Sequence, residues 1–396
     1  MGNKSNKKSL IITGFPYAFP YYFKVFECLE NKDNFIFILP KLWLAKKGKV
    51  RIKLQQKPNL EIYGLSAVSY GGHGIRGLFK GWLPGIIFLL PYLKIKYGTR
   101  ILYSCSEPNL LTTLYNGMIA KLCGFRHVIF TWQNIAPQKY MGGLKLRIYT
   151  ILVRLNLFFA DGVICGNKKA QKIISNFKFP ISNTIVCPIS GVDTEKFRPG
   201  IIGNWREQLN IKPEEKAILF YGALDRRKGL NVLIDASYKL SAINCKLIIV
   251  GTGPKQEDLK LQVASYKLQD KIIFLDWMPN DQLPALLNSA DIFVYPSVPT
   301  KGWEEQFGYA MAEASACSVP VIATHTGSID EVVLHGETGL LVEPNNPEQL
   351  AEAMIGLLTN ENLSRQMGEK GRKYVTENFS HKIIAEKISN FLNKFL

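Results

Sequence analysis

The sequence predicts an α/β protein with two Rossmann-like domains. Short apolar runs alternate with amphipathic stretches along all 396 residues, which is typical of parallel sheets covered by helices. The alternation restarts after residues 189–204, a stretch rich in glycine and proline in which the charge balance also changes. We therefore expect one domain over residues 1–195 and a second over residues 196–380. A last helix over residues 381–396 is expected to pack back towards the first domain.

In the first half, runs of four to six mostly apolar residues indicate strands and longer amphipathic stretches indicate helices. The expected strands are residues 10–13, 35–39, 101–104, 127–132, 162–165 and 184–187. The expected helices are residues 18–29, 111–123, 144–159 and 168–177.

The second half repeats the alternation more regularly. The expected strands are residues 217–221, 246–251, 271–275, 291–295 and 319–323. The expected helices are residues 229–240, 254–266, 283–289, 309–315, 347–358 and most of the last thirty residues. Two such open sheets bind ligands at the carboxyl ends of their strands, so we expect a site in a central cleft that the two domains face.

The excess positive charge lies entirely in the first half. Residues 1–195 hold 27 Lys and Arg against 8 Asp and Glu, whereas the whole chain has a net charge of +17. A basic half of this kind attracts anionic partners, including the cytoplasmic membrane leaflet and nucleic acid. No recognised basic-aromatic motif supports nucleic acid binding, and we expect none.

The most apolar stretch, residues 82–93, is too short and too interrupted by proline to cross a bilayer. Lysines and an arginine flank it, so it fits an interfacial membrane segment, and it fits equally a core helix with exposed lysines. Residues 9–13 are too short for the core of a signal peptide. We expect a cytoplasmic protein that is peripheral at the inner face of the membrane.

The seven cysteines are scattered without a CxxC pair, which favours a reducing compartment over a disulfide framework or a zinc site. The five histidines show no metal-ligand spacing. We therefore predict no metal site and no cofactor.

The strongest chemical signal is the stretch Glu304-Glu305-Gln306-Phe307-Gly308-Tyr309-Ala310-Met311-Ala312-Glu313. It follows a predicted strand, and a helix that begins near Phe307 would point free N–H groups and its positive dipole end at an anion. One carboxylate could bridge two ribose hydroxyls and the other could bind sugar hydroxyls. Taken alone, two glutamates at this spacing are common, and Glu305 and Glu313 would more often be two unrelated surface glutamates.

A second signal is the loop Tyr221-Gly-Ala-Leu-Asp-Arg-Arg-Lys-Gly-Leu230, which joins a predicted strand to a predicted helix. Gly222 permits close approach of a ligand, and the cations Arg226, Arg227 and Lys228 can neutralise phosphate. A solvated basic turn is the alternative, but the loop lies at the carboxyl end of a strand.

With these motifs the sequence resembles glycosyltransferase family 4, the retaining nucleotide-sugar transferases of GT-B architecture. The resemblance extends over essentially the whole chain. Its other motifs are Ala160-Asp-Gly-Val-Ile-Cys, Gly191-Val-Asp-Thr-Glu-Lys-Phe-Arg-Pro199, Gly251-Thr-Gly-Pro254 and Ala290-Asp-Ile-Phe-Val-Tyr-Pro-Ser297. It implies an enzyme of the hexosyltransferase kind (EC 2.4), with a nucleotide sugar as co-substrate.

The resemblance also implies roles for individual residues. Glu305 would bind the transferred sugar, Glu313 the ribose, and Lys228 the diphosphate. Backbone N–H groups around Phe307, Gly308 and Tyr309 would bind sugar and phosphate oxygens.

The chain departs from the family pattern at two positions. Ala223 stands where the family commonly has an arginine after Gly222, so Arg226 or Arg227 would have to make the second phosphate contact. Gln133 stands where many relatives have a histidine near the transferred sugar; glutamine is no general base, but it donates and accepts hydrogen bonds. The stretch Trp132-Gln-Asn-Ile135 resembles a subset of the family.

Other candidates lie in the first half. Glu107 and Asn134 are candidate acceptor ligands, although Glu107 could simply begin a helix. His73 lies in a glycine-rich loop that could meet the phosphates or the acceptor, or be a plain turn. Gly14 ends the first strand and is expected in the floor of the cleft.

We therefore predict a retaining glycosyltransferase that moves a sugar from a nucleotide sugar to a saccharide or lipid-linked acceptor in polysaccharide or glycolipid synthesis. Two alternatives keep the fold: a non-catalytic protein that binds nucleotide sugars or glycans, and a sugar-nucleotide epimerase. Donor hydrolysis without acceptor separates an enzyme from a binding protein, and an isomerised donor identifies an epimerase.

Overall fold

The computed structural model describes residues 8–29, 33–45, 48–51, 60–69 and 75–396, and the chain divides into two compact units. The first unit takes in residues 1–191 and 381–396, and the second takes in residues 192–380. The division after Gly191 lies four residues before the boundary placed at residue 195 from the sequence.

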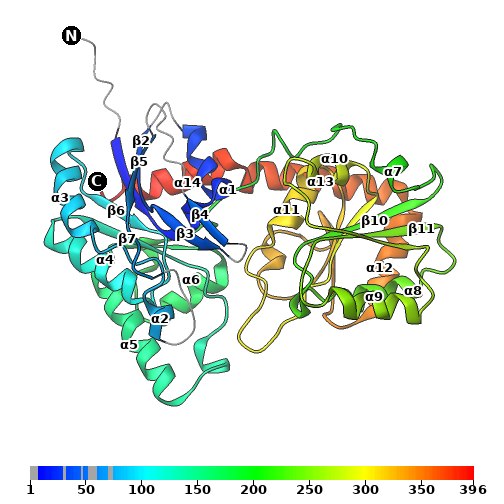
Figure 1. The fold of residues 1–396 in the computed structure, drawn as a ribbon, viewed down its shortest axis with the longest axis horizontal. Helices are drawn as coiled ribbons and strands as arrows, with labels where there is room; N and C mark the ends of the chain where they lie inside the picture. The colour runs from blue at the N-terminus through cyan, green and yellow to red at the C-terminus, as the bar shows by residue number, and fades with distance from the viewer. Residues whose placement is uncertain (1–7, 30–32, 46–47, 52–59, 70–74) are drawn as a thin grey trace, which may run out of the picture. The chain divides into compact units, whose positions relative to one another are not determined.

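The first unit contains a seven-stranded parallel sheet in the order β5-β2-β1-β6-β7-β8-β9 (Figure 1). Its strands are β1 (Lys8–Thr13), β2 (Asp33–Pro40), β5 (Leu60–Leu65), β6 (Ile101–Ser104), β7 (Arg126–Thr131), β8 (Gly162–Cys165) and β9 (Thr184–Val186). A separate antiparallel pair consists of β3 (Leu42–Ala45) and β4 (Gly48–Arg51).

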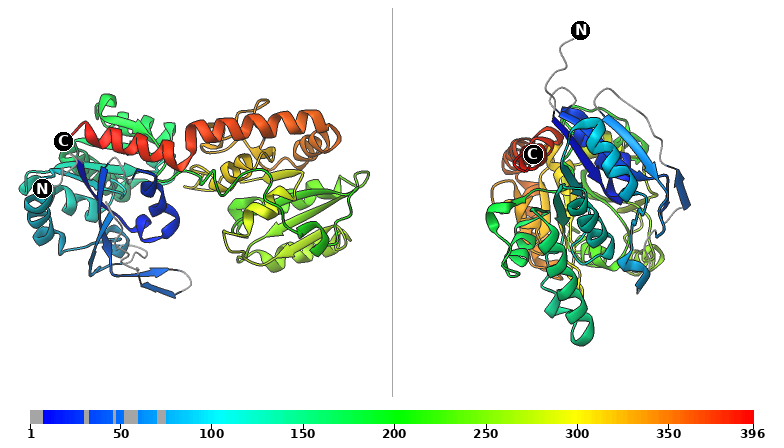
Figure 2. Two further views of the ribbon diagram at one scale, coloured as in Figure 1. Left: turned by 90° about the horizontal axis from the view of Figure 1, so that it is seen from above. Right: turned by 90° about the vertical axis from the view of Figure 1, so that its left-hand side faces the viewer.

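Four helices follow one another along one face of this sheet: α3 (Ile86–Tyr97), α4 (Leu111–Leu122), α5 (Gly143–Phe159) and α6 (Lys168–Ser175). The other face is covered by η1 (Phe15–Ala18), α1 (Pro20–Phe23), η2 (Lys24–Leu29) and the last helix, α14 (His381–Asn393). The chain therefore returns to the first unit at its end (Figure 2). The remaining short elements are α2 (Ile75–Leu78), η3 (Pro137–Lys139) and η4 (Ile181–Asn183).

The second unit contains a six-stranded parallel sheet in the order β12-β11-β10-β13-β14-β15. Its strands are β10 (Lys216–Tyr221), β11 (Cys245–Val250), β12 (Ile272–Leu275), β13 (Ile292–Tyr295), β14 (Val321–Thr324) and β15 (Gly339–Val342). On one face lie α8 (Leu230–Tyr238), α9 (Gln256–Ser265) and α12 (Pro347–Thr359), and on the other α10 (Leu283–Asn288), α11 (Tyr309–Ala316) and α13 (Glu361–Phe379) (Figure 1). The short α7 (Trp205–Gln208), η5 (Arg226–Lys228) and η6 (Ile329–Glu331) complete this unit.

The strand order reverses once in each sheet, and this reversal determines where a ligand fits. In the second sheet β10 has β11 on one side and β13 on the other, so the connections leave β10 and β13 in opposite directions. Such a reversal opens a crevice at the carboxyl ends of the two strands. In the first sheet the same reversal occurs between β1 and β6.

The α/β class and the two parallel sheets confirm the predicted fold. The helix predicted over residues 18–29 is not continuous. Ala18 ends η1, Pro20 stands at the first position of α1, where its missing N–H costs no hydrogen bond, and the 3₁₀ segment η2 takes over from Lys24. The sequence analysis also missed the edge strands β5 and β15, which are short and only partly buried.

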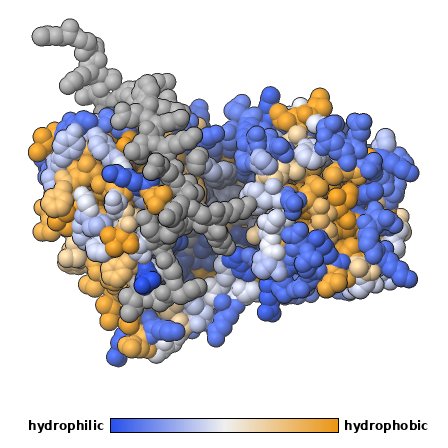
Figure 3. All heavy atoms as spheres, in the orientation of Figure 1, coloured by the Kyte–Doolittle hydropathy of each residue, from blue (hydrophilic) through white to orange (hydrophobic). Residues whose placement is uncertain are grey.

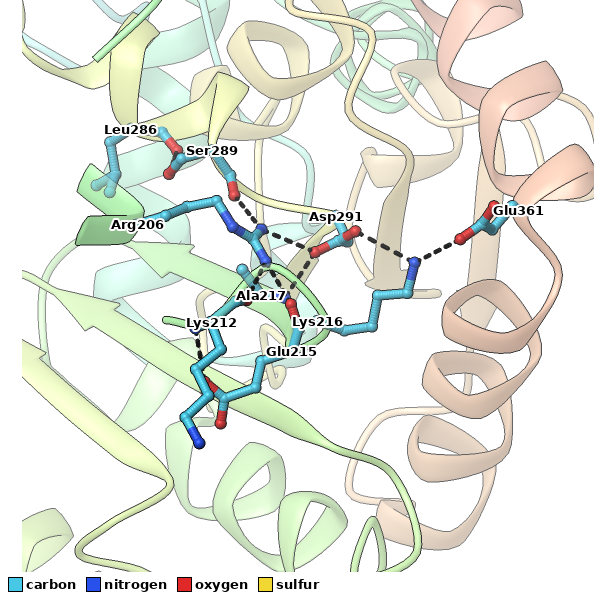
Figure 4. Close-up of polar contacts among 9 residues, drawn as sticks. All are labelled: Arg206, Lys212, Glu215, Lys216, Ala217, Leu286, Ser289, Asp291 and Glu361. Atoms are coloured by element: carbon cyan, nitrogen blue, oxygen red, sulfur yellow. Dashed lines mark hydrogen bonds and ion pairs between the residues drawn. The ribbon is translucent and has the colours of Figure 1, made fainter. Parts of the chain in front are cut away.

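Polar contacts close the amino end of the second sheet (Figure 4). The guanidinium of Arg206 on α7 donates to the carbonyl of Ser289 at 3.0 Å and lies 3.4 Å from a carboxylate oxygen of Asp291. The same Asp291 oxygen accepts the backbone N–H of Ala217 at 2.7 Å. These bonds satisfy backbone groups at the starts of β10 and β13.

A buried histidine supports the first sheet. His127 on β7 is fully buried, its Nε2 lies 3.0 Å from the hydroxyl of Ser104 on β6, and burial lowers its pKa to about 3. The folded unit therefore holds this imidazole in its neutral form.

This burial predicts a pH dependence. The unfolded chain protonates His127 near its usual pKa of about 6.5, so the stabilisation is complete above that pH and is lost as the pH falls towards 3, at up to about 1.4 kcal/mol per pH unit. Amide hydrogen exchange in β6 and β7, measured at pH 7 and pH 5, should show this loss. In His127→Gln, which cannot titrate, the loss should be clearly smaller; equal losses in both proteins would contradict this account.

Candidate active site

The candidate site lies at the carboxyl ends of β10 and β13, where the strand order of the second sheet reverses. Leu219 pairs with Phe293, and the same register continued by two residues places Tyr221 beside Tyr295. Both tyrosines are buried, and each donates a hydrogen bond to one of the two glutamates predicted from the sequence.

The first glutamate, Glu305, is part of a buried cluster. One of its carboxylate oxygens accepts hydrogen bonds from the ammonium of Lys228 at 2.6 Å, the hydroxyl of Tyr295 at 3.0 Å and the hydroxyl of Ser297 at 3.2 Å. Lys228 also donates to the hydroxyl of Tyr295. The side chains of Lys228 and Glu305 are only 12% and 11% exposed, so this ion pair is largely removed from water.

Tyr295 keeps its proton in this cluster. Burial, and then the charge of Glu305, raise its pKa well above the ordinary value. The hydroxyl therefore remains a donor to the carboxylate while it accepts from Lys228.

Glu313 is held separately on α11. It is 4% exposed, and its carboxylate accepts the hydroxyl of Tyr221 at 2.5 Å. The helix begins at Tyr309, the first residue of the expected helix 309–315, with Gly308 as its N-cap. The aromatic ring of Phe307 is buried and packs against Tyr309 and Phe379, which anchors the loop ahead of the helix.

The cationic turn η5 presents its three basic residues differently. Arg227 bonds to Asp225 and lies over the ring of Trp303, with its Cζ 4.7 Å from the ring centroid, and the ammonium of Lys228 lies 5.4 Å from the same centroid. Burial opposes ionisation of Asp225, but the hydrogen bonds from Arg227 outweigh it and lower the pKa of the carboxyl. Arg226 is exposed and, with Lys255, lines a separate hollow of about 300 Å³.

Two glycines permit this arrangement. Gly229 has φ +62°, and a Cβ there would lie 1.9 Å from the carbonyl oxygen of Pro296, so only glycine lets η5 approach the end of β13. Gly327 has φ +60°, and its Cβ would lie 1.9 Å from the carbonyl oxygen of Glu305. The next residue, Ser328, donates its N–H to that oxygen at 2.9 Å, so this turn fixes the backbone of Glu305.

The first unit holds a second constellation, at the ends of β6 and β7. The two carboxylate oxygens of Glu107 accept the hydroxyl of Thr131 at 2.7 Å and the backbone N–H of Trp132 at 2.8 Å, and burial raises the pKa of this carboxyl. The amide of Gln133 donates to the hydroxyl of Tyr140 at 3.0 Å and to the carbonyl of Ile135. Glu107 and Gln133 thus hold the loop after β7 in place.

Four candidate residues remain, and the structure describes three of them. Asn134 is buried in the same loop, and Gly14 directly follows β1. Gly222 directly follows β10 and donates its N–H to Val250. His73 lies outside the described residues.

The structure thus brings Lys228 and Glu305 together, and Arg227 lies beside them over the ring of Trp303. Arg226 does not join this cluster and lines the hollow that it shares with Lys255. Sequence reasoning missed Tyr221, Tyr295, Ser297, Asp225 and Trp303. Tyr221 and Tyr295 could have been predicted as site residues, because each is a hydroxyl-bearing aromatic residue at the end of a central strand. Among the described residues, no group of three His, Cys, Asp or Glu side chains could hold a metal ion.

Two sheets of this topology define the GT-B class of protein. The solved structure of HepE from Anabaena in complex with UDP superposes with a TM-score of 0.75 at 18% identity, covering 98% of this chain and 100% of that one. The same protein was also solved in complex with UDP-glucose, with a TM-score of 0.71. This likeness concerns the fold.

A family model matches most of the second unit. Residues 202–374 match the model of the glycosyl transferases group 1 family. These residues include both glutamates, the cationic turn and both tyrosines.

Two curated proteins show the extent of the similarity. The chain is 33% identical over 208 residues to the GDP-mannose-dependent alpha-(1-6)-phosphatidylinositol monomannoside mannosyltransferase of Mycobacterium tuberculosis, over 51% of this chain and 54% of that protein. It is 32% identical over 188 residues to an uncharacterized glycosyltransferase of Methanocaldococcus jannaschii, over 47% of each. The chain spans about half the length of the curated relatives it matches.

The close approach at Gly327 predicts a large effect of a single methyl group. Gly327→Ala should lower the free energy of unfolding by about 2 kcal/mol or more, because the left-handed φ and the contact with Glu305 both oppose a Cβ. The matched change Gly356→Ala, inside α12 with nothing within 4 Å of the added atom, should raise it by about 0.5–1 kcal/mol. Urea denaturation followed by circular dichroism measures both, and an unchanged midpoint for Gly327→Ala would contradict the described turn.

Proposed function

We propose that the chain is a retaining glycosyltransferase that moves a sugar from a nucleotide-activated donor to a saccharide or lipid-linked acceptor. The observation that carries the proposal is the buried Lys228–Tyr295–Glu305 cluster at the reversal point of the second sheet. The match of residues 202–374 to the glycosyl transferases group 1 model and the UDP-glucose in the HepE structure support a nucleotide-sugar donor.

The donor diphosphate is assigned to the cationic side of the cluster. An ammonium has three N–H donors, and Lys228 uses two of them for Glu305 and Tyr295, so one remains for a phosphate oxygen. Arg227, held over Trp303, is the second phosphate ligand in place of the arginine that the family commonly has where this chain has Ala223. The N–H groups around Phe307, Gly308 and Tyr309 lie at the start of α11, where the helix dipole favours negative charge.

The two glutamates bind different parts of the donor, Glu305 the transferred sugar and Glu313 the ribose. Glu305 binds hydroxyl groups of the transferred sugar. Glu313, fixed by Tyr221, accepts two adjacent ribose hydroxyls, as acidic residues do in dinucleotide-binding folds.

The proposed chemistry is transfer on one face of the sugar. The bond from the anomeric carbon to the phosphate oxygen breaks, the acceptor oxygen bonds to the same face of that carbon, and the acceptor proton passes to the leaving phosphate. Lys228 and Arg227 stabilise the charge that develops on the leaving diphosphate. Glu305 orients the sugar and does not attack it.

The acceptor is assigned to the first unit. Glu107, Gln133 and Asn134 lie at or after the carboxyl ends of β6 and β7, in a unit with a strong positive charge. A relative named as acting on phosphatidylinositol monomannoside supports a lipid-linked acceptor, and we propose peripheral contact of this unit with the anionic inner face of the cytoplasmic membrane. All seven cysteines are unpaired, in keeping with a cytoplasmic location. None of the described helices is long and apolar enough to cross a bilayer.

A donor screen tests this function. A panel of nucleotide sugars should include one that raises the melting temperature, because a ligand that binds only the folded state stabilises it. That donor should also be hydrolysed slowly without acceptor to free sugar and nucleoside diphosphate. Binding without hydrolysis in any acceptor mixture would favour a non-catalytic protein, and an isomerised donor would favour an epimerase.

Substitution of Glu305 should separate catalysis from folding. Glu305→Gln removes the charge that pairs with Lys228 and should lower kcat/KM for donor hydrolysis by about a hundredfold or more. Glu337→Gln, an exposed change in the same unit, should leave the rate within about twofold. Undiminished turnover by Glu305→Gln would exclude the assigned role.

Substitution of Tyr221 should weaken binding of the nucleoside diphosphate. Tyr221→Phe removes the donor that fixes Glu313, so the Kd for the nucleoside diphosphate should rise by about tenfold. Tyr238→Phe, an exposed tyrosine on α8, should leave the Kd unchanged. Isothermal titration calorimetry gives both constants, and equal Kd values for Tyr221→Phe and the parent protein would contradict the role of Glu313.

A further inference from the structure

The outer helices of the first unit carry an apolar surface. On α5, five apolar side chains are 41% to 79% exposed: Leu144, Ile148, Ile151, Leu155 and Phe158. They recur at alternating intervals of four and three residues, so they form one stripe along the helix, about 21 Å long. Exposed apolar patches of this extent mark interaction surfaces.

The stripe is additional to the face that anchors α5 in the fold. The opposite side of the helix buries Tyr149, Val153 and Leu157 against β7, β8 and α6. The helix therefore has an apolar side in the core and a second apolar side in solvent, which the fold of this unit does not require.

Neighbouring helices extend the surface. On α4, which packs between α3 and α5, Met118 and Leu122 are exposed, and on α3 Phe88 and Ile95 are more than 80% exposed. Apolar residues accordingly gather along the edge of the first unit where these three helices lie (Figure 3).

The charged residues on the three helices themselves are all basic. The sequences of α3, α4 and α5 contain no Asp or Glu. Lys145, Arg147 and Arg154 are exposed beside the stripe, and none of them has an acidic partner within the part of the chain that the structure describes. An apolar stripe edged by cations fits an anionic lipid surface, in which the apolar side chains enter the interface and the cations meet the headgroups.

A second copy of the chain fits this surface poorly. The spacing of the stripe would suit a two-helix coiled coil, but Lys145, Arg147 and Arg154 would then flank the seam on both helices with no acidic residue to pair with them. Like charges across such a seam oppose association.

From these observations we propose that α5, together with the exposed ends of α4 and α3, is the membrane-docking surface of the chain. This inference rests on the proposed function for its lipid-linked acceptor and identifies the element that brings the enzyme to it. It extends the contact from residues 82–93, named from the sequence, to α5, whose apolar stripe is longer and is flanked by exposed cations.

Vesicle co-sedimentation tests the proposal with the full chain. The protein should sediment with vesicles of phosphatidylcholine and phosphatidylglycerol at low salt, bind pure phosphatidylcholine much less, and dissociate as salt rises. Ile148→Gln/Ile151→Gln and Arg147→Glu/Arg154→Glu should each lower the partition coefficient by about tenfold or more.

Matched changes in the second unit are the controls. Ile202→Gln/Leu261→Gln alters two exposed apolar residues, and Lys370→Glu/Lys373→Glu makes the same change in net charge as the arginine pair. Both should bind vesicles within about twofold of the parent. Thermal melts of all variants establish that they fold.

Three outcomes would overturn the proposal: no sedimentation of the parent protein, equal loss in the control variants, or a dimer that Ile148→Gln/Ile151→Gln dissociates without any vesicle binding. Failure of the proposed function is distinguishable from these. The α5 variants should hydrolyse a soluble donor at the parent rate, and Glu305→Gln should bind vesicles like the parent. A parent protein that binds vesicles but does not hydrolyse any donor contradicts the proposed function only. A parent protein that hydrolyses a donor but does not bind vesicles contradicts the docking surface only.

Discussion

The candidate site depends on one interaction, the buried ion pair between Lys228 and Glu305. An ion pair removed from water gains little net stability, whereas loss of one partner leaves an unpaired charge whose burial is costly. The pair is tolerable because the hydroxyls of Tyr295 and Ser297 also donate to the carboxylate. A fold that needed only stability could fill this space with apolar side chains, and the proposed function gives these charges a ligand.

The strand order explains why these groups meet. Lys228 follows β10, Tyr295 ends β13 and Glu305 follows β13, and these two strands are neighbours at the reversal of the second sheet. The first sheet repeats this principle: Glu107 follows β6 and holds the loop after β7 through Thr131 and Trp132. In both units a buried carboxylate fixes the loops at the carboxyl edge, while the outer helices, α5 above all, are left to make other contacts.

Much of this was predictable from the sequence. The alternation of apolar and amphipathic runs predicted both parallel sheets, and the resemblance to a known family made Glu305, Glu313 and Lys228 the candidate site residues. The partners of these residues were not predictable, because Tyr221 and Glu313 are 92 residues apart in sequence and meet only through the register of β10 and the start of α11. The stripe on α5 was likewise hidden, since an apolar helix sequence does not reveal which of its sides remains in solvent. The expected helix over residues 18–29 forms α1 and then the 3₁₀ segment η2, and the apolar spacing of the sequence does not distinguish these two kinds of helix.

A crystal structure of the chain with a nucleoside diphosphate is the most direct measurement of the central claim. The account predicts that the terminal phosphate contacts the ammonium of Lys228 and the N–H groups at the start of α11, and that the ribose hydroxyls bond to Glu313. A diphosphate bound elsewhere in the second unit, with the Lys228–Glu305 pair untouched, would contradict it.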